Sequence, residues 1–367
     1  MKKCRLAGLI LNVTLFSCLT SRASADEPVI SAEEAKRNGY VAIPYSPSGK
    51  TVDLPDQERL PWPFESLSPT GYLGNNYNQF QPYPNNPGYH WGVDVMVEED
   101  SWILAPVSGR VEAGHYNYTL NPDGSKIKQW IPWPEQGLNI YFEVAVIADN
   151  GMRYELHHVD RYTLTQEVID GLNSGNLVVE KGARLGKVYD WFGPEEYDHV
   201  HLNVVRPDGR HLNPEPFFTA IDDDMAPEVR FFAVLASGEA IWLEDNSVLP
   251  ETPAAIYAWG HDRKNHNKWV HALTALKVVA ADRSVQGFDF GNSIFTSNES
   301  VVSILDIYPS DVMGPDGTVI RQPDEFYPYD HLKFLMQVKL KSSVSGSVQV
   351  IAQDSAGNQT TVTIRVL

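Results

Sequence analysis

The nine residues Gly88-Tyr-His-Trp-Gly-Val-Asp-Val-Met96 hold a histidine and an aspartate, His90 and Asp94, with three residues between them. Much later in the chain, the segment Tyr197-Asp-His-Val-His-Leu-Asn-Val-Val205 holds a His-x-His pair. Neutral imidazoles and a carboxylate make the N/N/O ligand set of a catalytic zinc ion, which keeps a fourth position for water. The two segments therefore predict a zinc site around which the first half of the chain folds.

The His-x-His segment alternates like a β-strand. Residues two apart on a strand share a face, so His199, His201 and Asn203 lie on one side. The residues between them are apolar and point the other way, toward a core: Val200, Leu202 and Val204. A polar face opposite an unbroken apolar face indicates a binding surface, and a solvated strand face is the alternative interpretation.

Between the two motifs, Tyr154-Glu-Leu-His-His-Val-Asp160 offers two adjacent histidines. A strand of period two cannot turn both of them toward the same side. His158 has the parity of the apolar residues of this segment, whereas His157 has the parity of Arg153 and Glu155. We therefore expect His158 at the site and His157 on the surface.

Residues 1–25 have the pattern of a secretory signal peptide. A basic start precedes a mostly apolar run over 6–19, and Ala23-Ser-Ala25 fits a cleavage site. The apolar run is too short, and has the wrong flanks, for a membrane-spanning helix. We therefore expect an exported protein, periplasmic or extracellular, with no membrane span.

Both cysteines, Cys4 and Cys18, lie in the signal segment, so the mature chain is expected to have neither a thiol nor a disulfide. Leu15-Phe-Ser-Cys18 loosely matches a lipoprotein box, which leaves lipid anchoring as the second interpretation. Removing the segment deletes four basic residues and no acid, and so takes the formal charge from −18 to −22. A chain this negative is not expected to bind nucleic acid.

The chain of 367 residues, 43% of them apolar and 21% charged, is long enough for two folded domains. We expect an extended lead-in over 26–59, a first domain over 60–220 and a second over 226–367. Short alternating segments separated by turn residues predict an all-β fold class. Residues 115–137 read as a long inserted loop, of the kind that forms a groove wall.

The second domain is predicted to be an immunoglobulin-like β-sandwich, because short strands and turns recur along it. The expected strands cover 229–235, 276–281, 332–340, 347–353 and 360–366. Two polar stretches have no expected role in the chemistry. Asp222-Asp-Asp224 is expected to be a solvated linker, and His261-Asp-Arg-Lys-Asn-His266 a hydrophilic loop without a metal.

These motifs, in this order, resemble the lysostaphin-type, LytM-like zinc endopeptidases (peptidase family M twenty-three), bacterial enzymes that cut peptidoglycan peptides. The resemblance covers about Leu60 to Phe218. Connecting segments match as well: Trp91-Gly-Val-Asp94, Ala105-Pro-Val-Ser-Gly109, Lys181-Gly-Ala-Arg-Leu-Gly186 and Leu212-Asn-Pro214. The resemblance implies a small antiparallel β-sheet peptidase domain with an open groove and one Zn²⁺ per chain. The second domain resembles immunoglobulin-like modules attached to exported bacterial enzymes.

Carried over position by position, the resemblance implies roles for five residues. His90, Asp94 and His201 would be the zinc ligands. His158 and His199 would be the catalytic imidazoles, one serving as acid and base and the other stabilising an oxyanion. Which histidine takes which role stays open.

The expected function is that of an exported zinc metalloendopeptidase that hydrolyses peptidoglycan stem peptides or cross-links. Peptidoglycan peptides are the expected partners, with a possible wall contact through the second domain. The alternative is a catalytically inactive LytM-like module that regulates wall hydrolases. A zinc carboxypeptidase or amidase is a third interpretation, which product analysis would separate.

Overall fold

The structure is a computed structural model, and it describes residues 59–68, 72–82, 88–120, 126–135, 137–191, 197–207, 210–265, 267–290, 294–296, 304–324 and 331–367. The expected signal peptide and almost all of the lead-in lie outside these residues. No helix in the described part of the chain is long and apolar enough to cross a membrane.

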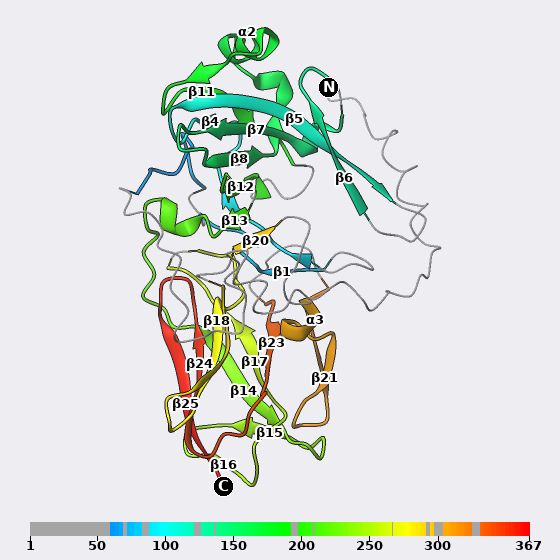
Figure 1. The fold of residues 1–367 in the computed structure, drawn as a ribbon, viewed down its shortest axis with the longest axis vertical. Helices are drawn as coiled ribbons and strands as arrows, with labels where there is room; N and C mark the ends of the chain where they lie inside the picture. Colours follow the sequence, from blue (N-terminus) through cyan, green and yellow to red (C-terminus); the bar gives the residue numbers. More distant parts are fainter. Residues whose placement is uncertain are drawn as a thin grey trace, which may run out of the picture.

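The all-β fold class is confirmed. Most regular structure in the described residues is strand, arranged in several mainly antiparallel sheets. The described α-helices are short, α2 (Gln166–Ser174) and α3 (Ile304–Ile307). Figure 1 shows the first, large sheet at one end of the molecule and the C-terminal sheets at the other.

The first sheet has nine strands, all paired antiparallel. Its path runs through β10 (Val178–Val179), β5 (Gly109–Leu120), β7 (Phe142–Ile147), β8 (Arg153–His157), β12 (His199–Val205), β13 (Arg210–Leu212) and β20 (Ile294–Thr296). Off this path, β3 (Val93–Met96) pairs with β12, and β6 (Lys126–Pro132) pairs with β5. The strand β12, which carries the His-x-His motif, is therefore internal and flanked by β8 and β3. Figure 1 shows β12 between β8 and β13.

The alternation predicted for β12 is confirmed. Val200, Leu202 and Val204 are fully buried on its apolar face. Burying each such side chain is worth roughly 1.5–3 kcal/mol. A register slip of one residue would turn this face to water, so the packing of the core fixes the side on which the polar residues stand.

The prediction of a long loop over 115–137 is wrong. The strand β5 continues to Leu120, and β6 returns beside it with Gly114 opposite Pro132 and Leu120 opposite Lys126. The turn between them, 121–125, lies outside the described residues. The segment is thus mainly a β-hairpin extending the sheet, and its mixed polar and aromatic composition concealed the alternation.

The C-terminal part contains a four-stranded and a five-stranded sheet. The first has β15 (Ala240–Leu243), β14 (Glu228–Val234), β17 (Ala255–His261) and β23 (Phe334–Lys339). The second has β16 (Val248–Leu249), β25 (Gln359–Val366), β24 (Gly346–Gln353), β18 (Ala275–Val279) and β19 (Val285–Asp289). Their inward residues, among them Ala258, Met336, Leu276 and Val350, share one buried core, as expected for a β-sandwich.

Three small sheets complete the described strands. They are β1 (Phe80–Gln81) with β2 (Gly88–Tyr89), β4 (Trp102–Leu104) with β11 (Arg184–Val188) and β9 (Val159–Asp160), and β21 (Asp311–Met313) with β22 (Val319–Arg321).

The two halves of the chain meet over a wide junction. The strand β20 comes after the expected boundary, yet it pairs with β13 in the first sheet. Buried apolar residues of the first sheet and of the sandwich also belong to one continuous cluster. The division at 220–226 stays a prediction, and the two parts share both a sheet and a core.

Candidate metal centre

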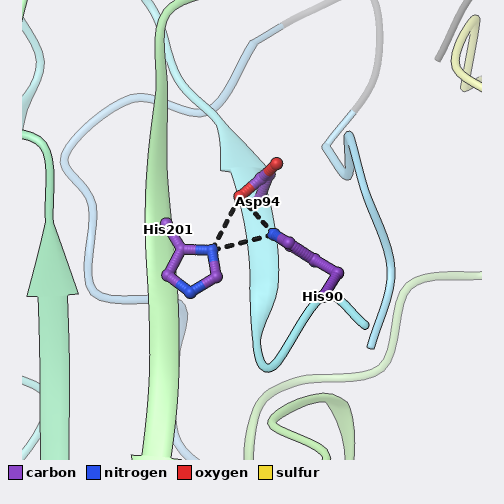
Figure 2. A group of neighbouring side chains, drawn as sticks. All are labelled: His90, Asp94 and His201. Atoms are coloured by element: carbon purple, nitrogen blue, oxygen red, sulfur yellow. Dashed lines mark hydrogen bonds and ion pairs between the residues drawn. The ribbon is translucent and has the colours of Figure 1, made fainter. Parts of the chain in front are cut away.

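The strands β3 and β12 bring two of the predicted ligands face to face. Asp94 and His201 are partners in this antiparallel ladder, and side chains at directly opposite positions lie within contact distance. His90 stands just before β3 and turns back toward the same point (Figure 2). The structure therefore brings His90, Asp94 and His201 together as a group that could hold a metal ion.

The three ligand atoms form a nearly equilateral triangle. Asp94 Oδ1 lies 3.0 Å from His90 Nε2 and 3.0 Å from His201 Nδ1, and the two nitrogens are 2.9 Å apart. Tetrahedral zinc with bonds of 2.0–2.1 Å needs ligand atoms roughly 3.3 Å apart. The N/N/O donor set and its spacing therefore fit zinc.

The protonation of the group also suits a metal. Burial raises the pKa of Asp94, but nearby histidines and the hydrogen bonds from His201 and His90 outweigh it and hold that pKa well below its usual range. Burial lowers the pKa of His201 to about 3, with Asp94 opposing it. At neutral pH the site thus offers a carboxylate and a neutral imidazole, the forms that bind metal.

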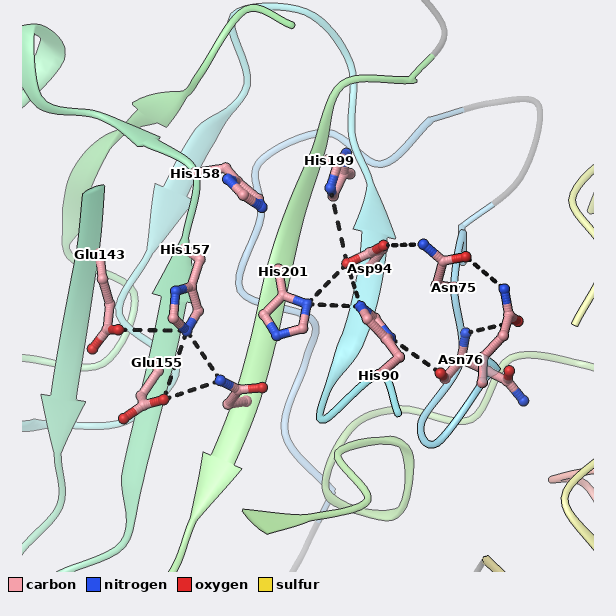
Figure 3. A network of polar contacts seen from close by, with 12 residues as sticks. Asn75, Asn76, His90, Asp94, Glu143, Glu155, His157, His158, His199 and His201 are labelled. Carbon is pink, nitrogen blue, oxygen red and sulfur yellow. Dashed lines mark hydrogen bonds and ion pairs between the residues drawn. The ribbon is translucent and has the colours of Figure 1, made fainter. Parts of the chain in front are cut away.

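A second layer of contacts orients these ligands (Figure 3). Asn75 donates from Nδ2 to Asp94 Oδ2 at 2.7 Å, which leaves Oδ1 for the metal. The carbonyl of Asn76 lies 3.1 Å from His90 Nδ1, so that nitrogen donates and Nε2 keeps its lone pair. The sequence does not mark these two asparagines, because the Gly-, Asn- and Pro-rich stretch 70–88 has no periodic pattern. Such outer contacts fix ligand orientation and basicity.

The segment that carries these asparagines is in turn held by the C-terminal part. Gln79 donates to Asn75 Oδ1 at 2.5 Å and accepts from the Ala272 backbone N–H at 3.2 Å. Asn267 Nδ2 donates to the Leu73 carbonyl at 2.9 Å. A continuous series of hydrogen bonds therefore runs from Ala272, beyond the expected boundary, to the metal ligand Asp94.

The two predicted catalytic histidines stand beside the triangle with ring centroids 5.0 Å apart. His199 Nδ1 lies 2.9 Å from the Tyr197 carbonyl, and His158 Nδ1 lies 2.5 Å from the Ile140 carbonyl. Each backbone contact occupies Nδ1 and leaves Nε2 available, and His199 Nε2 is 3.9 Å from Asp94 Oδ1. Burial lowers the pKa of both rings, so both are neutral at pH 7.

His158 reaches this place by a route that strand parity did not predict. Glu155 is the ladder partner of Asn203, so the charged face of β8 is the face of the site and the apolar face is the core. The strand ends at His157, and His158 adopts a left-handed backbone with φ 63°. This turn brings the His158 ring to the site. The parity argument was therefore wrong, although the residue it chose lies beside His199.

His157 is not a surface residue, which corrects the second half of that argument. Its side chain is buried, and Nε2 lies 3.0 Å from Asn203 Nδ2 and 3.4 Å from Glu143 Oε2. Its ring centroid is 5.1 Å from that of His201. Figure 3 shows His157 with Glu143 and Glu155 beside the metal centre. Arg153 pairs with the two carboxylates at 2.9 and 2.8 Å and completes this charged network.

Trp191 forms an aromatic wall over the two catalytic candidates. It stacks on His199 at 4.7 Å with an interplanar angle of 18°, and its edge meets His158 at 4.7 Å. The backbone N–H of Trp191 donates to Asp198 Oδ1 at 3.1 Å, which holds the backbone at Trp191 in place. The signal in the sequence was a tryptophan shortly before the His-x-His motif.

The polar face of the sheet continues into a hollow of about 420 Å³. Its lining includes Glu112, Tyr116, Trp130, Arg153, Glu155 and Arg206. Glu155 lines the hollow, and its Oε2 lies 3.6 Å from His157 Nε2, so the hollow adjoins the charged network around His157.

Known proteins add little to this geometry. No protein-family model matches the sequence, and no curated protein matches it. A chain from a structure described as the SpoIIQ–SpoIIIAH pore-forming complex is 16% identical, and the alignment covers 44% of this chain and 91% of that chain. Its TM-score is 0.28, a value too low to carry an argument.

Proposed function

We propose that this chain is an exported zinc metalloendopeptidase that hydrolyses peptide bonds in peptidoglycan stem peptides or cross-links. The observation that carries the proposal is the convergence of His90, Asp94 and His201 with a second pair of neutral imidazoles beside them. The substrate class rests on the order of the motifs, which resembles that of LytM-like peptidases. The proposed location rests on the signal-like pattern of residues 1–25.

Zinc held by His90, Asp94 and His201 would supply an activated water and a Lewis acid for the scissile carbonyl. The rings of His199 and His158 supply the proton transfers. A neutral Nε2 accepts the proton that the attacking water loses and delivers it to the departing amine nitrogen. The other ring takes a proton from solvent at Nε2 as charge develops on the carbonyl oxygen, because its Nδ1–H is already engaged, and the new N–H donates a hydrogen bond to the oxyanion. The backbone carbonyls at Nδ1 hold both rings in orientation, and either ring fits either role.

Trp191 and the hollow beside Glu155 suggest how a peptide is placed. The indole covers one side of the histidine pair, which limits the approach of bulk water. The hollow offers carboxylates and guanidinium groups together with two aromatic rings, Tyr116 and Trp130. Such a mixed lining suits a peptide that carries both amine and carboxylate groups, as cross-linked wall peptides do.

The test is digestion of purified sacculi by the mature, zinc-loaded chain, with the released ends identified by mass spectrometry. New amine and carboxyl termini within stem peptides or cross-links are the expected result. His199→Ala, which keeps the three metal ligands, serves as the inactive control, and Glu251→Ala on the exposed surface serves as the active one. Zinc bound in full with no cleavage would favour the regulatory module instead. Release of C-terminal residues would favour a carboxypeptidase. Cleavage of the bond between sugar and peptide would favour an amidase.

A further inference from the structure

A second buried polar group lies where the two parts of the chain meet. It comprises Asp223 before β14, Asp262 after β17 and Asp354 after β24, and one carboxylate oxygen of each lies within 4.8 Å of the others. Asp262 and Asp354 are 2% and 1% exposed. The expectations of a solvated linker over 222–224 and a hydrophilic loop over 261–266 are therefore wrong for Asp223 and Asp262, because packing between the two parts encloses them.

Each carboxylate in this group has a buried oxygen with no hydrogen-bond partner among the described residues. These atoms are Asp223 Oδ2, Asp262 Oδ1 and Asp354 Oδ2. The opposite oxygens have other contacts: Asp354 Oδ1 accepts from the backbone N–H groups of Gly357 and Asn358 at 2.7 and 2.9 Å. A buried carboxylate oxygen without a donor is costly, and three of them together indicate an ion or water at that point.

The charge of the surroundings gives the same indication independently. Lys264 Nζ lies 3.1 Å from Glu215 Oε2 and 3.8 Å from Asp223 Oδ2. One ammonium thus faces four carboxylates, those of Glu215, Asp223, Asp262 and Asp354. The adjacent His271 adds no charge at neutral pH, because burial lowers its pKa to about 4. Burial and the neighbouring carboxylates raise the pKa of Asp262 to about 8. An excess of buried negative charge requires a counter-ion or bound protons.

We propose that Asp223, Asp262 and Asp354 bind one Ca²⁺ ion at the junction of the two parts. The offered atoms are all carboxylate oxygens, which are the ligands that calcium prefers, and they come from three separate segments. Mg²⁺ keeps most of its waters and demands a strict octahedron, so it fits a buried group of three carboxylates less well. Zinc prefers nitrogen or sulfur ligands, which the group of His90, Asp94 and His201 offers and this one does not.

The ion would hold the segment 222–224 against the sandwich segments that carry Asp262 and Asp354. Asp262 exchanges two backbone hydrogen bonds with His271 at 2.9 and 2.8 Å, which closes the segment that carries Asn267. Asn358, next to the Asp354 turn, donates to the Asp223 carbonyl at 3.0 Å. Fixing these residues would therefore also support Leu73, whose carbonyl accepts from Asn267, and through it the segment around the metal centre.

The experiment titrates Ca²⁺ alone into the full mature chain after removal of metals, with calorimetry and thermal unfolding as readouts. We expect one calcium per chain and a rise in Tm of roughly 5 °C at about 100 times Kd. Asp262→Asn keeps the shape of the side chain and removes the cost of protonating or burying a carboxylate on folding. It should therefore unfold at a higher temperature than wild type without Ca²⁺, and show no rise with Ca²⁺. With Ca²⁺ present, the wild type should therefore unfold at a higher temperature than Asp262→Asn.

Two further proteins keep the test decisive. Asp354→Asn provides a second variant from another segment, and Glu244→Gln removes an exposed charge as the matched control, which should respond like wild type. His201→Ala, which lacks a zinc ligand, should bind Ca²⁺ like wild type. The calcium result therefore does not depend on whether the proposed peptidase function is correct. No heat and no change in Tm for wild type would overturn the proposal and assign charge balance to Lys264 and bound protons.

Discussion

The metal centre and the aspartate group at the junction are both buried and polar, but they differ in donor atoms and in charge. The first joins two imidazoles to one carboxylate, with its ligand atoms 2.9–3.0 Å apart. The Asn75 side chain and the Asn76 carbonyl satisfy the remaining polar atoms of Asp94 and His90. The second joins three carboxylates whose free oxygens have no donor among the described residues. The first is thus prepared for a soft or borderline cation, and the second for a hard one.

The largest expected effect is the loss of zinc on removal of a ligand. Asp94→Ala and His201→Ala should each weaken zinc binding by more than ~100-fold, beyond the usual 10–100-fold of an outer contact. Elemental analysis and competition with a chromogenic chelator measure this. Both variants should still respond to Ca²⁺. Undiminished zinc in both would show that the ligand assignment is wrong.

The next effect separates metal binding from turnover. His158→Ala and His199→Ala should retain zinc and lose ~10²-fold or more in kcat, the usual contribution of an acid–base or electrostatic group. Peptide hydrolysis followed by mass spectrometry, with zinc content measured on the same samples, provides the readout. Loss of zinc together with activity would instead make these rings ligands.

His157→Ala sharpens that comparison, since its ring lies beside His201 without joining the triangle. Removing it deprives Glu143 and Glu155 of a partner at 3.4 and 3.6 Å. We expect zinc to be retained and the free energy of unfolding to fall by about 1–3 kcal/mol. Denaturant unfolding at fixed zinc measures this. A loss of turnover as large as that of His158→Ala, with stability intact, would place His157 in the chemistry.

A smaller effect tests whether the C-terminal part supports the metal centre. Asn267→Ala removes the donor to the Leu73 carbonyl, and zinc affinity should fall by ~10-fold as an outer contact is lost. Glu251→Ala, on the exposed surface, is the matched control. If the expected first domain over 60–220 is independent, a shortened chain ending near Asp224 binds zinc by itself. Unchanged affinity in both Asn267→Ala and that shortened chain would restore the simpler picture of two independent domains.

The smallest effect is a pair of opposite pH dependences in the metal-free chain. The pKa of His201 falls from 6.5 to about 3 on folding, so the unfolded state binds more protons in that window and stability is lost as pH falls through it. The pKa of Asp262 rises from 3.8 to about 8, so its contribution is lost as pH rises through that window. Each slope is at most ~1.4 kcal/mol per pH unit.

Denaturant unfolding between pH 4 and 9 measures both slopes. Asp262→Asn should abolish the loss on the alkaline side and steepen the loss on the acid side, because the two windows overlap between pH 3.8 and 6.5 and their slopes oppose each other there. Saturating Ca²⁺ should also remove the alkaline loss, because the ion replaces the protons. An alkaline slope that persists in Asp262→Asn would assign it to another group.

The sequence by itself determined the features that depend on short spacing. Alternation along 199–205 and 153–157 predicted strands with one buried face, because the period of a strand is two. The His-x-x-x-Asp and His-x-His motifs indicated three metal ligands, which the structure places together, because ligand chemistry restricts which residues can share an ion. The all-β class followed from the same alternation.

Only the tertiary structure decided what depends on contacts between distant segments. The φ of 63° at His158 lies outside any strand pattern and sets which histidine faces His199. The link to Asp94 begins with a hydrogen bond between Ala272 and Gln79, which are 193 positions apart, and amide side chains such as Asn75 carry no periodic signal. Asp223 and Asp262 look like solvent-exposed acids in the sequence, because burial is a property of packing and not of composition.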